Sequence, residues 1–329
     1  QRIKELAQKA ESDALSMEIM VSEVFKFYEG YRSGKENIFP PMRIQYKDFA
    51  AWQEQQLQQG IFHRHRQYWR RQLASPLPCL ELPFDKERPQ IMTYNGDTVK
   101  LHFDESTVRK LTLLSQQYEV TMFMLLVAAL DVLFYHLTGQ TDIILGTPVL
   151  AREHGDLQEQ VGLYINTVVI RTIFSPGDRF TEVLEKVKQV TLDSLENQGY
   201  PFDRLVEDLG IERDPARHPL FDVMVDMIDM KRMKEILNRP GLEISLYGDI
   251  PRKAKFDLTV YIFEYSDSLE VEFDYNTDLF EKETVDYTAE CFERIIDLII
   301  EKPGERISGL AVEPAAEFSP IQALPGRKE

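Results

Sequence analysis

Hydrophobic residues recur every three or four positions at the start of the chain, from Ile3 to Tyr31. This spacing places them on one face of a single long helix, which we expect to end near Gly34. Two more helical patterns follow, over residues 46–58 and 62–73, and the second has a basic face. The sequence therefore predicts a helical segment over roughly the first 75 residues.

The next stretch is marked by its prolines. Four of them fall within fifteen residues, at Pro76, Pro78, Pro83 and Pro89. Proline at this density does not fit inside a helix or a central strand. We expect a connection over residues 76–96, a larger lobe over 97–312 and a linker over 313–329.

Within the larger lobe, segments in which apolar and polar residues alternate, as in strands, are followed by segments in which apolar residues recur every three or four positions, as in helices. We expect a hairpin that turns through residues 266–268. The predicted strands cover residues 97–103, 142–151, 162–174, 221–228, 242–248, 256–266 and 268–276. The predicted helices cover residues 104–118, 121–137, 179–197, 202–209 and 281–301. Such a mixture predicts an α/β fold, a two-layer sandwich of helices on a mixed or mostly antiparallel sheet.

The charge, the apolar content and the cysteines of the chain argue against several classes of function. The net charge of −17 argues against nucleic-acid or anionic-membrane partners, because both are bound largely through clustered cations. The apolar run over residues 122–137 is too short to span a bilayer. The two cysteines, Cys79 and Cys291, lie far apart without metal-ligand spacing, which fits reduced thiols and a cytoplasmic location. Because the chain begins at Gln1 rather than Met, we expect a processed or excised fragment.

The residues alone indicate no active site. The histidines lack the spacing of a catalytic triad or a metal site, and no phosphate-binding glycine loop is present. His63 and His65 lie two apart on a helix and point to different faces. His136 ends an apolar helix, where a structural partner is expected. We expect no metal.

Four short motifs carry a resemblance to a known family. They occur in one order and at matching spacing between about residues 12 and 313, and they are YKDFAAW (46–52), VGLYINTVVIR (161–171), NQGYPFDRLVEDL (197–209) and RDPARHPLFDVMV (213–225). These motifs resemble those of condensation domains of nonribosomal peptide synthetases, which are related to chloramphenicol acetyltransferase. The resemblance implies the acetyltransferase-type α/β sandwich.

The resemblance also implies a chemistry and its partners. Condensation domains form peptide bonds in antibiotic biosynthesis: an acceptor amine attacks a donor thioester in a tunnel between two lobes. Both substrates arrive on the 4'-phosphopantetheine arms of carrier proteins, so no cofactor is bound directly. The implied partners are donor and acceptor peptidyl carrier proteins and adjacent synthetase domains.

The family signature His-His-x-x-x-Asp-Gly is only partly present. Asp13 and Ala14 fall at its Asp and Gly, whereas Gln8 and Lys9 occupy the two histidine positions. We therefore expect a C-terminal lobe with the end of an N-terminal lobe, inactive by itself, in which residues 1–11 are foreign or diverged. Apolar surface left exposed between lobes would favour self-association.

Other family positions suggest structural or tunnel roles. Asp13 either pairs with Arg152 in the interior or is an exposed acid, since burying a lone carboxylate is costly. The candidates for lining the tunnel are Tyr164, Asn166, Asp214 and Arg217. An asparagine on a strand is more often bonded to backbone, so Asn166 keeps both interpretations. His218 replaces a family asparagine in a loop, and we do not expect it to be a catalytic base.

Three alternatives stay open or are disfavoured. A noncatalytic condensation-like module that binds carrier proteins or recruits a partner is the main alternative. A coenzyme A-dependent acyltransferase is disfavoured because it needs the same histidine, and an epimerization domain because its motif near residue 165 differs. The basic run over residues 63–71 either meets an acidic carrier protein or is a solvated helix face, which is commoner.

Overall fold

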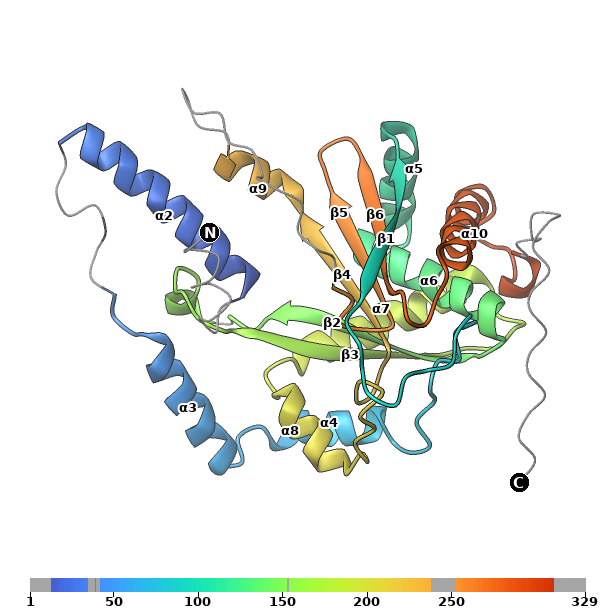
Figure 1. The fold of residues 1–329 in the computed structure, drawn as a ribbon, viewed down its shortest axis with the longest axis horizontal. Helices are drawn as coiled ribbons and strands as arrows, with labels where there is room; N and C mark the ends of the chain where they lie inside the picture. Colours follow the sequence, from blue (N-terminus) through green and yellow to red (C-terminus); the bar gives the residue numbers. More distant parts are fainter. Residues whose placement is uncertain (1–12, 35–38, 40–41, 153, 238–252, 311–329) are drawn as a thin grey trace.

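A six-stranded mixed sheet forms the centre of the computed structural model, which describes residues 13–34, 39, 42–152, 154–237 and 253–310. The strand order is β1-β6-β5-β4-β2-β3 (Figure 1). β4 pairs in parallel with both β2 and β5, and the other pairs are antiparallel. The strands are β1 (Gly96–Phe103), β2 (Asp142–Leu150), β3 (Ile165–Ile173), β4 (Val223–Asp229), β5 (Leu258–Glu264) and β6 (Leu269–Asn276). The predicted α/β sandwich with a mixed sheet is confirmed, as is the β5–β6 hairpin.

Four helices cover one face of this sheet and enclose the main core. They are α5 (Glu105–Gln117), α6 (Met122–Thr138), α7 (Phe180–Glu196) and α10 (Lys282–Glu301). α6 is apolar on nearly every side because α5, α7 and α10 all pack against it. No single helix in the described ranges is long and apolar enough to cross a membrane; α5 and α6 reach that hydropathy only together, as a pair bent by 99°.

One carboxyl group lies inside this core. Asp131, in the middle of α6, is fully buried and neither of its side-chain oxygens has a hydrogen-bond partner. Burial raises the pKa of Asp131 well above its ordinary value, because a charge without a partner is strongly disfavoured in an apolar interior. Burial therefore disfavours the charged form of this carboxyl group.

A smaller core lies on the opposite side of β2 and β3, under the helices α4 (His63–Gln72) and α8 (Phe202–Leu209). Trp69 of α4 is 1% exposed and packs there, and its indole nitrogen donates to the Asn197 carbonyl at 3.1 Å. Burying a Trp stabilises by several kcal/mol when its N–H keeps a partner, on the order of 3–5 kcal/mol relative to Ala. This core holds α4 rigidly against the sandwich.

The remaining helices lie on the side away from α10 (Figure 1). These are α2 (Ala14–Arg32), α3 (Tyr46–Gln58) and α9 (Met230–Leu237), which follows β4 directly and contacts α2. The prediction of one continuous helix from residue 3 to 31 is wrong at Asp13, whose extended backbone (φ −92°, ψ 174°) begins α2 as its N-cap. Asp13 accepts hydrogen bonds better there than inside a helix. The predicted strand over 242–248 and linker over 313–329 lie outside the described residues.

Polar side chains cross the uncovered face of the sheet. The strand registers align Lys100 of β1, Glu272 of β6, Tyr261 of β5 and Asp226 of β4 in one row. Lys100 forms ion pairs with Glu272 and, at 3.0 Å, with Glu270. Burial raises the pKa of Asp226 to about 6. This side of the sheet therefore carries a row of ionisable side chains across β1, β6, β5 and β4, next to the smaller apolar core over β2 and β3.

Candidate functional site

Asp13 is the centre of a buried hydrogen-bond network. Its Oδ1 accepts from the backbone N–H of Ser16 at 2.8 Å and from the Ser16 hydroxyl at 2.7 Å. Its Oδ2 accepts from the backbone N–H of Tyr164 at 3.0 Å. The Ser16 hydroxyl also contacts the Gly162 carbonyl at 2.8 Å. The network therefore ties the start of α2 to the loop that leads into β3.

Arg152 supplies the charge that balances Asp13. Its Nη2 lies 2.9 Å from Oδ1 and 3.1 Å from Oδ2, which confirms the ion pair expected from the sequence. Its Nη1 donates to the carbonyls of Leu157 and Gln160, each at 2.5 Å, and the guanidinium lies 4.2 Å from the centre of the Tyr164 ring. Arginine suits this position because its planar fork can serve several acceptors at once.

The electrostatics of the pair favour its charged form. Burial alone would raise the pKa of Asp13, but the hydrogen bonds from Ser16, Arg152 and Tyr164 outweigh it, and the pKa is lowered. The alternative of an exposed acid is ruled out, since the side chains of Asp13 and Arg152 are 0% and 1% exposed. Such a pair contributes chiefly by fixing two segments in one arrangement, because removing either partner leaves a buried charge.

The loop beside the network is closely packed. A Cβ atom at Gly162 would lie 2.6 Å from the ring of Tyr46 and 2.8 Å from that of Tyr164. Those two rings meet edge to face, with centroids 5.2 Å apart, and Phe49 packs on Tyr164 at 4.9 Å. The tyrosine and phenylalanine of the YKDFAAW motif thus hold α3 against this loop.

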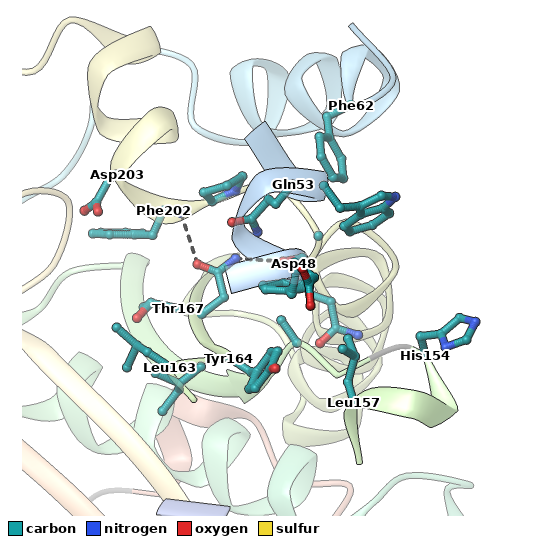
Figure 2. A pocket seen from close by; sticks show the side chains of 18 of the residues that line it. Asp48, Gln53, Phe62, His154, Leu157, Leu163, Tyr164, Thr167, Phe202 and Asp203 are labelled. Atoms are coloured by element: carbon teal, nitrogen blue, oxygen red, sulfur yellow. Dashed lines mark hydrogen bonds between the residues drawn. The ribbon is translucent and has the colours of Figure 1, made fainter. Parts of the chain in front are cut away.

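A pocket of about 850 Å³ opens next to the network, within the range of about 300–1,000 Å³ that is typical of small-molecule sites. Its walls come from α3, the 151–165 segment, the start of β3 and the start of α8. In Figure 2, the side chains of Asp48 and Gln53 lie between those of α8 and His154. The aromatic lining residues are Phe49, Trp52, Phe62, Tyr164 and Phe202.

Asn166 lines this pocket and also bonds to backbone, so both interpretations of this residue hold geometrically. Its amide nitrogen donates to the carbonyls of Gln198 and Tyr200 at 2.7 and 2.8 Å, and its Oδ1 accepts from the N–H of Phe202 at 3.0 Å. All three bonds hold the NQGYPF segment against β3. Asn166 therefore positions the α8 wall of the pocket.

Two of the tunnel candidates lie elsewhere. Asp214 accepts from the N–H of Ala216 at 2.8 Å in an exposed turn. Arg217 pairs with Asp222 at 2.6 Å and contacts the sulfur of Cys79. Tyr164 and Asn166 are brought together at the pocket, whereas Asp214 and Arg217 do not line it.

The histidines have structural partners in most cases. His136 contacts the Ile307 carbonyl at 3.0 Å, as expected of a structural residue. His218 contacts the Lys255 carbonyl at 2.9 Å and lies against the Phe256 ring at 4.2 Å. Burial lowers the pKa of both imidazoles.

Several pocket residues had not been singled out from the sequence. Asp48 and Trp52 lie inside the YKDFAAW motif and Asp203 follows the Tyr-Pro-Phe string, so the motifs were the available signal. His154 had no such signal. Gln8 and Lys9 lie outside the described residues. Among the residues that are described, no group of three or more His, Cys, Asp or Glu could hold a metal ion.

Comparisons with known proteins agree with this geometry. A sequence model of the family "Condensation domain" matches residues 12–319. The chain is 36% identical over 321 residues to surfactin synthase subunit 1 of Bacillus subtilis and 36% identical over 307 residues to tyrocidine synthase 3 of Brevibacillus parabrevis. These alignments cover 96% and 93% of the chain but only 9% and 5% of the relatives, so the chain spans less than a tenth of their length.

The fold has solved counterparts. The X-domain from teicoplanin biosynthesis is 26% identical, with a TM-score of 0.83, over 92% of this chain and 69% of that one. Its strand and helix arrangement therefore matches nearly all of the chain. Motifs, fold and sequence similarity all lead to one conclusion: this chain belongs to the condensation-domain family.

Proposed function

We propose that the chain is part of a condensation domain of a nonribosomal peptide synthetase. In the proposed reaction the amine of an acceptor aminoacyl thioester attacks the carbonyl carbon of a donor thioester. A C–N bond forms, the C–S bond breaks, the amine loses a proton and the donor thiol is released. The donor group ends on the acceptor carrier.

The observation that carries this proposal is the buried Asp13–Arg152 pair. It lies where the Asp of the family signature falls, and it joins the start of α2 to the loop before β3. A signature Asp in a fully bonded interior site fits a role in holding the catalytic segment in place. Tyr164 connects this network to the pocket, which offers an aromatic and polar surface beside it.

The partners are carrier proteins and the neighbouring domains of a synthetase, in the cytoplasm. Their 4'-phosphopantetheine arms bring the substrates, so the chain itself needs no bound cofactor. The arm is uncharged along its pantetheine portion and carries two amides, which suits a pocket that combines aromatic rings with Gln53 and Asn166.

By itself, the chain is proposed to be inactive. Gln8 and Lys9 stand at the two histidine positions of the signature, and neither a carboxamide nor an ammonium can accept the proton of the attacking amine at neutral pH. Incubation with donor- and acceptor-loaded carrier proteins, followed by intact-protein mass spectrometry, tests this. We expect unchanged masses; a dipeptidyl acceptor would overturn it.

A fusion tests the proposed function itself. Residues 10–312 are joined to the part of a surfactin synthase condensation domain that ends with its own two signature histidines. We expect dipeptidyl acceptor in the same assay, and no product when these two positions are Gln and Lys. If a folded fusion with both histidines forms no dipeptide, the proposed function is wrong for this chain.

A noncatalytic binding module is the second candidate. The TM-score of 0.83 with the X-domain favours it, since that X-domain has also been solved in complex with the protein OxyB. This candidate predicts that the chain retains a partner domain without transferring any acyl group. The binding-module candidate would be supported if the histidine-containing fusion formed no dipeptide but still bound carrier proteins.

A further inference from the structure

Helix α4 carries a cationic face that neither the Asp13 network nor the pocket uses. The chain has a net charge of −17, yet this ten-residue helix holds four arginines and two histidines and no acidic residue. The local charge is therefore opposite to that of the whole molecule. A local positive charge of this kind attracts negatively charged groups over a distance of about one Debye length, which is about 8–10 Å at physiological salt.

The helix is rigidly fixed from below. Trp69 is buried, and the hydroxyl groups of Tyr68 and Ser194 are 3.2 Å apart. Arg66 makes two hydrogen bonds to Asp208 of α8, at 2.7 and 2.6 Å. A fixed backbone lowers the entropy that a partner must overcome on binding.

Three arginines remain on the solvent side, and we call Arg64, Arg70 and Arg71 the α4 arginine face. Arg70 and Arg71 are exposed and form no ion pair with any residue that the structure describes. The Arg64 side chain is 85% exposed and forms an ion pair at 3.7 Å with Glu196, whose side chain is 69% exposed, so this pair is a weak one at the solvent surface. These guanidinium groups are available to external carboxylates.

The N-terminal end of α4 borders the pocket, and Arg64 lies in the first turn of the helix. Phe62, the N-cap residue of α4, lines the pocket, and α8 contacts α4 while contributing Phe202 and Asp203 to the pocket wall. Figure 1 shows α4 and α8 side by side below the sheet. A domain bound to α4 would stand beside the opening through which a tethered substrate could enter.

We propose that the α4 arginine face is a docking surface for an acidic carrier domain, an inference that rests on the proposed function. Charge complementarity carries the choice of partner: a compact domain with a carboxylate-bearing helix can contact these three arginines alone. An extended polyanion or a lipid surface would also meet the acidic remainder of the molecule and be repelled.

The experiment measures binding of a negatively charged carrier domain from surfactin synthase subunit 1 by isothermal titration in 50 mM NaCl. The test variant is R70E/R71E. The matched control is R109E/K110E on α5, which changes the net charge equally at two exposed positions without ion pairs among the described residues. Circular dichroism establishes that both variants are folded.

We expect the dissociation constant to rise at least tenfold for R70E/R71E and less than twofold for the control, with the difference shrinking in 500 mM NaCl. Equal effects in both variants would overturn the proposal, because general charge would then explain binding. So would displacement of the carrier by a single-stranded RNA oligonucleotide or by phosphatidylserine vesicles. If the wild-type chain binds no carrier at all, the proposed function fails together with this inference; if it binds and R70E/R71E binds equally, only the inference fails.

Discussion

Asp13 and Arg152 are oppositely charged and almost completely buried, and their ion pair joins segments far apart in sequence, as does the bond from the Tyr164 N–H to Asp13. The stability of such a pair is asymmetric: the intact pair contributes modestly, whereas one partner left alone is strongly unfavourable. Asp131 presents the contrasting case, since its buried carboxyl oxygens accept no hydrogen bond and burial raises its pKa. The direction in which the pKa of a buried aspartate shifts in this protein therefore depends on the groups that surround its carboxyl group.

Removing the guanidinium should destabilise the protein strongly. We expect R152M to lower the free energy of unfolding by about 3–5 kcal/mol, because Asp13 would keep a buried charge without its counterion. Urea unfolding followed by tryptophan fluorescence measures this. The pKa of Asp13 is lowered, so its stabilising contribution is complete above the ordinary value of 3.8 and disappears as the pH falls below it. The R152M penalty should shrink in acid.

The double variant D13N/R152M is the matched comparison. Asn can still cap α2, and neither charge remains, so most of the lost stability should return. R204M, which removes the exposed partner of Glu207, should leave the unfolding midpoint unchanged. A loss in R152M no larger than that in R204M would contradict a buried, coupled pair.

Asp131 predicts a pH dependence of the opposite sign. Its folded-state pKa is raised, so its contribution is most favourable below the unfolded-state value near 3.8 and is lost as the pH rises toward the folded-state pKa. We expect D131N to become progressively more stable than the wild type between pH 4.5 and pH 8, by up to about 1.4 kcal/mol per unit of pKa difference. Urea unfolding at three pH values measures this.

The exposed hairpin residue Asp267 provides the control for that series. D267N should follow the wild-type curve at every pH, because Asp267 lies in a solvent-exposed turn. A constant difference between D131N and the wild type from pH 4.5 to 8 would contradict the prediction, because it would mean that the folded-state pKa of Asp131 is not raised above its unfolded-state value.

At the scale of elements, one side chain decides where α8 begins. Asn166 on β3 accepts from Phe202 and donates to the carbonyls of Gln198 and Tyr200. α8 is further held by Asp208, which is bonded to both Arg66 and the Tyr200 hydroxyl. The position of this wall of the pocket thus depends on a strand residue rather than on the helix itself.

Substitutions at Asn166 separate donation from acceptance. N166A should cost about 1–3 kcal/mol, since three backbone groups lose a partner. N166D should cost more, because it retains the acceptor for Phe202 but places a carboxylate oxygen against two carbonyls. Hydrogen exchange should speed up over residues 198–209 and stay unchanged in β5 and β6. Uniform acceleration across the sheet would mean that the effect is global rather than local.

At the scale of the whole molecule, a row of exposed apolar side chains lies on α2, on the side away from α10. Tyr31 is 88% exposed, and the others in the row are Val24, Phe27 and Tyr28. A face of this kind on a helix is typical of an interaction surface. Among the described residues, none of the four helices that cover the sheet exposes four large apolar side chains in a row, as α2 does.

This surface predicts self-association of the isolated chain. Sedimentation velocity between 5 and 200 μM should show a rising average mass, because water is released when apolar faces meet. V24S/Y31S should reduce the effect, whereas I91S/L113S, which removes two exposed apolar side chains elsewhere, should not. A monomer at every concentration would contradict the prediction.

The sequence by itself determined the order and type of most elements, because hydrophobic periodicity depends only on neighbours along the chain; the short helix α9 was not predicted. The strand–helix succession after residue 96 and the β5–β6 hairpin follow from that local signal. The family motifs added the Asp13–Arg152 pair, which no spacing rule could have supplied. The prediction of a continuous helix through Asp13 was wrong. Hydrophobic spacing contains no information about the distant Arg152 and Tyr164, whose bonds to Asp13 favour its position as an N-cap.

Only the tertiary structure decided which residues share a site. It brought Tyr164 and Asn166 together with Asp48 and Trp52, and it placed Asp214 and Arg217 in a separate turn. It also showed that Trp69 anchors α4 while its arginines face solvent. The physical reason is that burial, pairing and pocket shape depend on contacts across more than a hundred residues of sequence, and the energies of those contacts are set only once the sheet has formed.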